Sequence, residues 1–340
     1  GGWVELGRHT LGSANDYLEV ASLADKRYYK MIWHVIDGTA SWCQPGWRLG
    51  NSTVDTGGNY AERYVRDGAA DTAYGTNTYN GLWANAASPN TDLFGVSYFT
   101  NNSAKEKLAI HHAVGGATGA AAAPSRLESV GKWTNTSNPL DLVRLEHQAT
   151  GNGYNTNSEC VILGWDPADT HTTNFWEELG EITIGSAASS MTSSTFTAKK
   201  YLWVQGYIKP DGTDTITPTL QLGNGTIDTG NNYSTRYSFI GGADGTITSN
   251  DTMEFLYNTG AKGEPIFFNT FIINNASNEK LSLTHVVSQE TAGAGTAPQR
   301  SVGVGKWTNT SNQANILKID QWSGTGNLGT DSIVKIWGSD

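Results

Sequence analysis

Many of the side chains able to do chemistry in this chain recur in pairs, 173 or 174 positions apart. The matched polar residues include Asn51/Asn224, Asp55/Asp228, Arg63/Arg236, Asp71/Asp244, Glu106/Glu279 and His112/His285. A site that both copies retain must be built from such pairs. These residues are therefore the first candidates for a catalytic, metal-binding or ligand-binding site.

The matched acids argue against glycoside hydrolysis, which needs two carboxylates about 5–9.5 Å apart across a cleft. Asp55 and Asp71 lie in Gly-rich turns, as do Asp228 and Asp244. In such turns Asp commonly accepts hydrogen bonds from the nearby backbone. The same turns offer oxygen atoms to calcium, but the ordered ligand series of a calcium-binding loop is missing. We predict turn capping, with no metal and no cofactor.

Nucleophilic catalysis also lacks a matched set of residues. The sequence has no G-x-S-x-G motif, and neither Cys43 nor Cys160 has a cysteine at the equivalent position. His112 and His285 fall on the apolar face of a predicted strand, which favours core histidines over catalytic bases, and His111 faces the other way. Cys160 is interpreted as a small buried residue, and a disulfide with Cys43 stays open. We predict that the protein is not an enzyme.

Sugar binding is the chemistry that the paired residues leave open. An exposed aromatic ring beside hydrogen-bond donors can hold a glycan, whereas aromatic residues on alternating strands usually pack in the core. Both readings apply to the tryptophan of the segment GKWTNTSN, which occurs in each copy, and core packing is favoured. The candidate ligand-binding residues are Trp133, Trp307, Arg63, Arg236, Tyr64 and Tyr237.

These pairs exist because nearly the whole chain is one segment written twice. LGNSTVDTGGNYAERY at 49–64 returns as LGNGTIDTGNNYSTRY at 222–237, and GKWTNTSN at 131–138 returns unchanged at 305–312. The period is far longer than the roughly 20–50 residues of a solenoid repeat. It predicts two homologous domains, residues 1–168 and 174–340, joined by a Pro/Asp/Thr-rich linker.

Strand signals fill each copy, and helix signals are nearly absent. Short runs with alternating apolar residues are separated by Gly, Asn, Asp or Pro. In KLAIHHAV, for example, Leu108, Ile110, His112 and Val114 share the face that we expect to be buried. About ten strands in each copy predict an all-β protein made of two tandem jelly-roll-like β-sandwich domains. The expected strands of the first copy lie near residues 5–11, 18–23, 28–36, 47–50, 60–66, 93–100, 107–114, 126–133, 142–147 and 159–165.

The composition excludes several classes of partner. The net charge is −10 and the Lys and Arg residues form no cluster, so we expect no direct contact with nucleic acid. No apolar run reaches the 18 or so residues of a membrane helix, and no signal peptide is visible at the start of the sequence. We expect no membrane association.

Two similar lobes in one chain favour assembly. Three such chains around an axis make a pseudo-sixfold block, and a two-lobed chain can also serve as a fibre module or a bivalent binder. A trimer or larger assembly of the chain with itself is the expectation. The alternative is a carbohydrate-binding, lectin-like protein with a glycan ligand, and a third reading is a glycan-degrading enzyme.

Four segments carry a resemblance to known sequences. They are WVELGRHTLGSA at 3–14, DTGGNYAERY at 55–64, APSRLESVGKWTNTSN at 123–138 and SECVILGWDPADTHTTNFWEELG at 158–180. They resemble uncharacterised structural proteins of tailed phages and environmental viruses, over both halves of the chain. The resemblance implies a capsid, tail-fibre or appendage component located in the virion or outside the cell, with other virion proteins as partners. It carries no catalytic residues.

Overall fold

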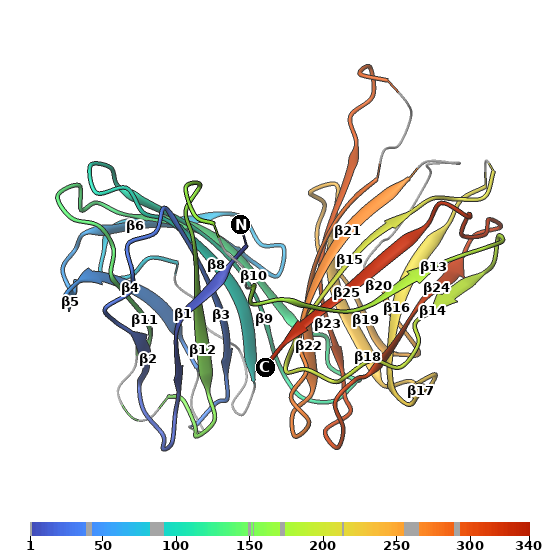
Figure 1. Cartoon of the computed structure of the whole chain (residues 1–340), viewed down its shortest axis with the longest axis horizontal. Coiled ribbons are helices and arrows are strands. Elements are labelled where there is room, and N and C mark those ends of the chain that lie inside the picture. Colours follow the sequence, from blue (N-terminus) through green and yellow to red (C-terminus); the bar gives the residue numbers. More distant parts are fainter. Residues whose placement is uncertain are drawn as a thin grey trace. The chain divides into compact units, whose positions relative to one another are not determined.

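The computed structural model describes residues 2–340 except 39–42, 82–91, 149–150, 152, 171–173, 213, 255–264 and 289–292. The described residues form strands, turns and connections, with no helix among them. They divide into two compact units (Figure 1). The first comprises Gly1–Ala117 and Ser125–Phe175, and the second comprises Thr118–Pro124 and Trp176–Asp340.

The first unit is a sandwich of two antiparallel sheets. Its large sheet has the order β1 (Val4–Thr10), β12 (Glu159–Trp165), β3 (Tyr28–Val35), β8 (Leu93–Thr100), β9 (Lys107–Gly115), β10 (Ser125–Trp133), β6 (Tyr60–Arg66), β7 (Thr72–Asn77). Its small sheet has the order β2 (Tyr17–Val20), β11 (Leu142–His147), β4 (Pro45–Asn51), β5 (Thr53–Val54).

The second unit repeats this order strand by strand. Its large sheet runs β13 (Glu177–Thr183), β25 (Ile333–Ser339), β15 (Tyr201–Ile208), β21 (Ile266–Ile273), β22 (Lys280–Ser288), β23 (Gln299–Trp307), β18 (Tyr233–Phe239), β19 (Gly245–Asn250). Its second sheet contains β14 (Ser190–Thr192), β24 (Ile316–Ser323), β16 (Thr217–Asn224) and β17 (Thr226–Ile227), and β20 (Met253–Glu254) pairs with β16. The predicted all-β, jelly-roll-like class is confirmed.

The division into units differs from a simple cut of the chain in half. The segment Thr118–Pro124, which connects β9 to β10, belongs to the second unit. The expected domains, 1–168 and 174–340, assign it to the first. Part of the expected linker, residues 171–173, lies outside the described residues.

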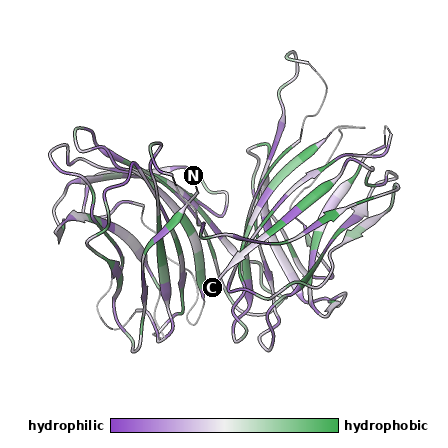
Figure 2. Cartoon of the chain, viewed as in Figure 1, coloured by the Kyte–Doolittle hydropathy of each residue, from purple (hydrophilic) through white to green (hydrophobic). Residues whose placement is uncertain are grey.

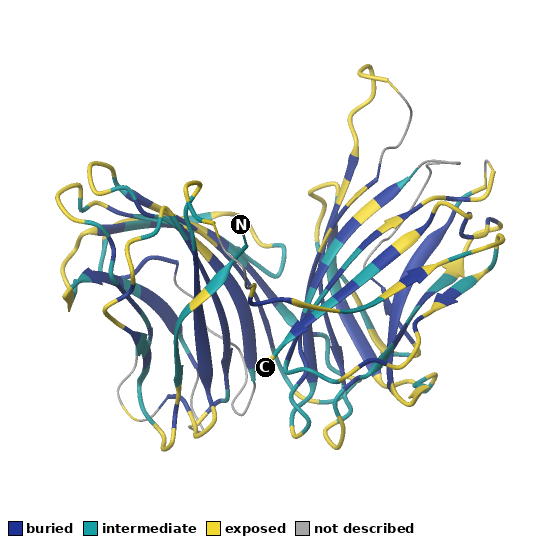
Figure 3. Cartoon of the chain, viewed as in Figure 1, coloured by how far each residue is buried: buried dark blue, intermediate teal, exposed yellow. Residues whose placement is uncertain are grey.

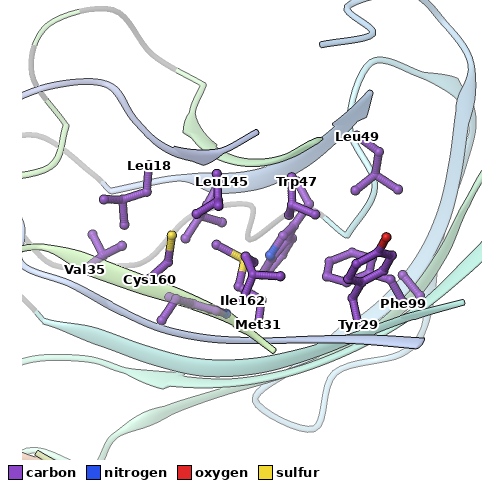
Figure 4. Packing of buried hydrophobic residues seen from close by; sticks show 14 of the residues in the cluster. Leu18, Tyr29, Met31, Val35, Trp47, Leu49, Phe99, Leu145, Cys160 and Ile162 are labelled. Carbon is purple, nitrogen blue, oxygen red and sulfur yellow. The ribbon is translucent and has the colours of Figure 1, made fainter. Parts of the chain in front are cut away.

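Each unit has its own hydrophobic core between its two sheets. In the first unit β3 contributes Tyr29 and Met31, while β4 and β11 contribute Trp47 and Leu145 from the opposite sheet (Figure 4). Hydrophobic residues lie mainly along the strands and hydrophilic residues in the connections (Figure 2). Burying large side chains of this kind supplies about 1.5–3 kcal/mol each, which is the main term favouring the fold.

The orientation of β9 corrects one expectation. Leu108 and Ile110 do share a face, but this face points away from the core, and both residues are exposed. The core side of β9 carries Ala109, His111 and Ala113. Small residues fit there because Trp33 and Trp47 fill the space between the sheets. His112, which we expected in the core, therefore lies on the face of the sheet that points away from the core. His285 of β22 lies on the equivalent face.

Candidate functional site

The two tryptophans proposed as sugar platforms lie inside the molecule. Trp133 and Trp307 are each 1% exposed. Trp133 Nε1 donates to Asp55 Oδ2 at 2.8 Å, and Trp307 Nε1 donates to Asp228 Oδ2 at 2.7 Å. A ring without an exposed face cannot stack on a ligand, so these two residues belong to the core. The core packing weighed for them from the sequence is what the structure shows.

The aspartates of the DTG turns cap their own backbone, as expected. Asp55 Oδ1 accepts a hydrogen bond from Gly57 N at 2.9 Å, and Asp228 Oδ1 accepts one from Gly230 N at 2.9 Å. Partial burial acts to raise the pKa of the Asp55 carboxyl. The hydrogen bonds from Trp133, Gly57 and Asn59 outweigh it, so the pKa lies below its usual value. These acids hold a turn and an indole in place.

The remaining predicted ligand residues do not form a single site. Tyr64 points inward and packs against the core cluster, with its ring stacked on Tyr74 at 6.2 Å. Its neighbour Arg63 points outward and is exposed, with Nη1 3.7 Å from Asp71 Oδ2. Arg236 is mostly covered, and its Nε donates to the carbonyl of Pro124 at 2.6 Å.

Tyr237, the last of these residues, is half-buried on β18. Consecutive residues of a strand face opposite sides of the sheet, so the arginine and tyrosine of each pair are separated. Of the six candidates, only Arg63 lies in the wall of the main pocket.

The buried cysteines and His111 are poor candidates for catalysis. Cys43 and Cys160 are free thiols without solvent exposure, and burial raises the pKa of the Cys160 thiol to about 12. His111 stacks on Trp47, with ring centroids 4.0 Å apart. Burial lowers the pKa of His111 to about 3, so the ring is neutral at physiological pH. It takes the core position that the sequence analysis gave to His112.

The main pocket is an open groove of about 700 Å³ on the outer face of the first unit's large sheet. Its floor comes from outward-facing side chains in two adjacent rows that run across six strands, from β12 to β6. One row is Trp165, Tyr28, Thr100, Leu108, Lys132, Ala61. The other is Leu163, Lys30, Tyr98, Ile110, Val130, Arg63, of which the buried Leu163 and Lys30 do not line the groove. We call the exposed centre of these rows, Tyr98, Leu108, Ile110 and Val130, the apolar face.

The two ends of the groove differ in chemistry. At one end Tyr28 stacks on Trp165, with ring centroids 5.3 Å apart, and Trp3 lies 6.5 Å from Trp165. At the other end are the cations Arg63 and Lys132, and Lys132 Nζ is 2.8 Å from Glu106 Oε2. The groove thus offers aromatic rings, exposed aliphatic side chains and positive charge in that order.

Lys30 lies below this surface. Its Nζ is 5.3 Å from the centroid of the Tyr98 ring, and burial lowers the pKa of its amine to about 7. At neutral pH this amine is therefore charged in only about half of the molecules.

In the second unit the equivalent face is filled with aromatic rings. Trp203 and Trp337 replace Lys30 and Leu163 and stack with centroids 4.5 Å apart. Phe271, at the position of Tyr98, stacks on Trp203 at 5.9 Å. The same strand positions therefore make a groove in one unit and a packed aromatic layer in the other.

Comparisons with known proteins identify no family. No protein-family model matches the sequence, and no curated protein matches it significantly. The solved structures with some similarity include the LG1–3 region of the laminin α2 chain, with 9% identity and a TM-score of 0.21. That match covers 96% of this chain, which spans 59% of the laminin fragment.

Domains LG4–5 of the mouse laminin α1 chain have 11% identity and a TM-score of 0.21 over 98% of this chain and 89% of that chain. At such TM-scores neither match supports an inference about function. The described residues also contain no helix long and apolar enough to cross a membrane.

Sequence reasoning missed the apolar face because it placed Leu108 and Ile110, two of its four residues, in the core. One signal was present in the sequence. Lys132 pairs with Leu108, and Arg63 follows Val130 and Ile110 in the next row, so two charged residues share the face of Leu108 and Ile110. Charged residues are almost never fully buried without a partner, so this face was better suited to solvent.

Proposed function

We propose that this protein is a non-enzymatic structural building block that self-assembles through its β-sandwich units. The observation that carries the proposal is the apolar face, four exposed hydrophobic side chains at neighbouring positions of three central strands. Contiguous apolar surface on a folded protein marks an interaction site. It lies at the centre of the sheet, where a flat partner surface can cover it.

The groove is better suited to binding than to catalysis. The charged side chains at its surface, Arg63 and Lys132, are cations. Glu62, which contributes to the wall, points inward, and its Oε1 accepts a hydrogen bond from Asn77 Nδ2 at 2.8 Å. Among the described lining residues there is thus no pair of opposed carboxylates of the kind that glycoside hydrolysis requires.

The proposed setting is a virus particle, in which the chain serves as a capsid, tail-fibre or appendage component. A trimer or larger assembly with other virion proteins as neighbours follows from the same proposal. The viral setting rests on the sequence resemblance alone. Self-assembly rests on the apolar face and on the duplication.

Glycan binding is the second candidate, and one observation favours it. The stacked pair Tyr28 and Trp165 borders the groove, and Arg63 supplies hydrogen-bond donors at the far end. Aromatic rings beside fixed donors can hold a sugar. A glycan array probed with the intact protein separates the two candidates, because glycan-specific binding by a protein that stays monomeric supports only the second.

Replacing Ile110 with Glu tests the assembly proposal. The side chain is 61% exposed, so the variant is expected to fold, while a charge buried in an apolar contact weakens association by about a hundredfold or more. Sedimentation velocity over a range of concentrations measures the assembly, and circular dichroism verifies the fold.

The matched control is Ile240→Glu, at an isoleucine of the second unit that is 58% exposed. It should assemble like the wild type. A wild-type chain that stays monomeric at all concentrations contradicts the proposal, and so does normal assembly of Ile110→Glu.

A further inference from the structure

The apolar face has a duplicate in the second unit, and the exposure of the two is reversed. Leu108, Ile110 and Val130 are 54%, 61% and 49% exposed. Their counterparts Leu281, Leu283 and Val304 are 4%, 2% and 1% exposed. The side chains are similar in type and lie on equivalent strands, so the two units differ in the exposure of equivalent positions.

In the second unit one edge of this face is occupied by the segment Thr118–Pro124. The segment lies against β18, β19 and the residue before β22, and hydrogen bonds join it to backbone and side chains there. The bonds are Gly119 N to Glu279 Oε1 at 2.7 Å, Ser249 N to the Ala120 carbonyl at 2.7 Å, Ser234 Oγ to the Ala122 carbonyl at 3.0 Å, and Arg236 Nε to the Pro124 carbonyl at 2.6 Å.

Of the four residues of the second unit that bond this segment, three have an equivalent in the first unit that can make the same bond. Glu106 and Arg63 stand where Glu279 and Arg236 stand in the second, and both have exposed side chains. Thr76 is the counterpart of Ser249, and both have left-handed backbones, with φ of 52° and 50°. Thr76 is exposed too. Ala61 replaces Ser234, so one hydroxyl donor is missing.

The segment also has a duplicate, Gly293–Pro298, which connects β22 to β23. Every residue in it is exposed. Gly293 has a φ of 99° and its counterpart Gly119 has a φ of 87°, values that favour glycine, so the two segments share a left-handed glycine at this position. The first segment is thus hydrogen-bonded to the second unit, whereas its copy makes no such bond to any described residue.

A second apolar row lies on the large sheet of the second unit. It crosses β25, β15, β21 and β22 on the outer face of the second unit, and its members are exposed: Ile333, Tyr207, Phe267 and Val287. Figure 3 shows the alternation of buried and exposed residues along β21. The equivalent row of the first unit is buried: Glu159, His34, Phe94 and Val114. Equivalent rows of the two large sheets therefore differ in exposure.

We propose that Gly293–Pro298 of one copy binds the outer face of the first unit of a second copy, beside the apolar face. This inference rests on the proposed self-assembly and names its contact surfaces. The N–H of Gly293 donates to the Glu106 carboxylate, and the Pro298 carbonyl accepts from Arg63. The row ending at Val287 then covers the apolar face.

Such a contact joins two different surfaces, so it is head-to-tail. Each copy retains one free face and one free segment after binding. Head-to-tail contacts give a closed ring when the rotation between copies closes, and a filament when it does not. Either product is consistent with a shell or fibre component.

Disulfide trapping between two variants tests the contact. Ala61 and Thr296 correspond to Ser234 and Ala122, whose hydroxyl and carbonyl oxygens are 3.0 Å apart, and both native cysteines are buried. Mixing Ala61→Cys protein with Thr296→Cys protein under mild oxidation should give a covalent dimer. Ala61→Cys mixed with Thr183→Cys, an exposed position on β13, is the control and should give none.

A second variant measures the same contact without a cross-link. Arg63→Ala removes a charged hydrogen-bond donor and should weaken association about tenfold or more, whereas Lys105→Ala, an exposed lysine of the same unit, should leave it unchanged. Assembly without trans cross-linking and without an effect of Arg63→Ala would overturn the head-to-tail contact while self-assembly stands. A wild-type chain that is monomeric at every concentration would overturn both.

Discussion

At the scale of single residues, the segments that are identical in both copies contain side chains that stabilise the fold. Asp55 accepts the indole N–H of Trp133 and caps its own turn, and Asp228 does the same with Trp307. The hydroxyl of Tyr60 donates to the Leu49 carbonyl and accepts from the Leu49 amide. Polar groups in a core must be paired, because an unpaired one costs about 1–3 kcal/mol. This requirement explains why DTG and GKWTNTSN are repeated without change in both copies.

His111 makes the stability of the first unit depend on pH. Its pKa is lowered to about 3 by burial, against 6.5 in the unfolded chain, so the unfolded state binds the extra proton. The contribution of His111 to stability is complete above pH 6.5 and is lost as the pH falls toward 3, by up to about 1.4 kcal/mol per pH unit.

Urea unfolding between pH 7 and pH 4 measures this loss, and His111→Leu should show a shallower one. Equal slopes for the variant and the wild type would contradict the assignment. The comparison isolates His111 from other groups, such as His147, whose pKa burial also lowers.

At the scale of elements, the two copies fill the same space in opposite ways. In the first unit Trp33 on β3 pairs with Gly95 on the adjacent strand β8. A Cβ added to Gly95 would lie 2.1 Å from the Trp33 ring. In the second unit Gly206 takes the position of Trp33 and Phe268 that of Gly95, and a Cβ on Gly206 would lie 2.2 Å from the Phe268 ring. One strand supplies the ring and its neighbour supplies the space, so the exchange conserves the fit between strands.

This exchange predicts strong coupling between the two positions. Trp33→Gly alone should cost about 3–5 kcal/mol because it leaves a cavity. Gly95→Phe alone should cost about 1–3 kcal/mol or more because of overpacking. The double variant copies the second unit and should be less destabilised than the sum, as measured by a double-mutant cycle in urea. Additive losses would contradict the interpretation.

At the scale of the whole molecule, two separate cores predict two unfolding events. Leu145 and Ile319 are buried equivalents on β11 and β24, one in each core. Replacing either with Ala should cost about 2–5 kcal/mol in its own unit. In differential scanning calorimetry each variant should lower a different transition. If both variants instead lowered the temperature of the same transition, the two cores would be shown to unfold together.

The sequence by itself determined the all-β class, the duplication, most strand positions and the capping role of Asp55 and Asp228. These features depend on local rules: alternation of apolar residues, turn-forming residues and the matching of two copies. The inward side of β9 could not be determined in this way, because Leu108 and Ile110 on one side and Ala109 and Ala113 on the other are all apolar. The volumes of Trp33 and Trp47, which come from other strands, decided which set faces the core.

The contrast between exposed Ile110 and buried Leu283 was also decided only by the tertiary structure. The two residues are alike in type and occupy equivalent positions of a duplicated strand. Their burial depends on what lies over the sheet, which no pattern within the strand encodes. The candidate site exists because these side chains of the first unit are exposed, and that exposure is a property of the folded molecule.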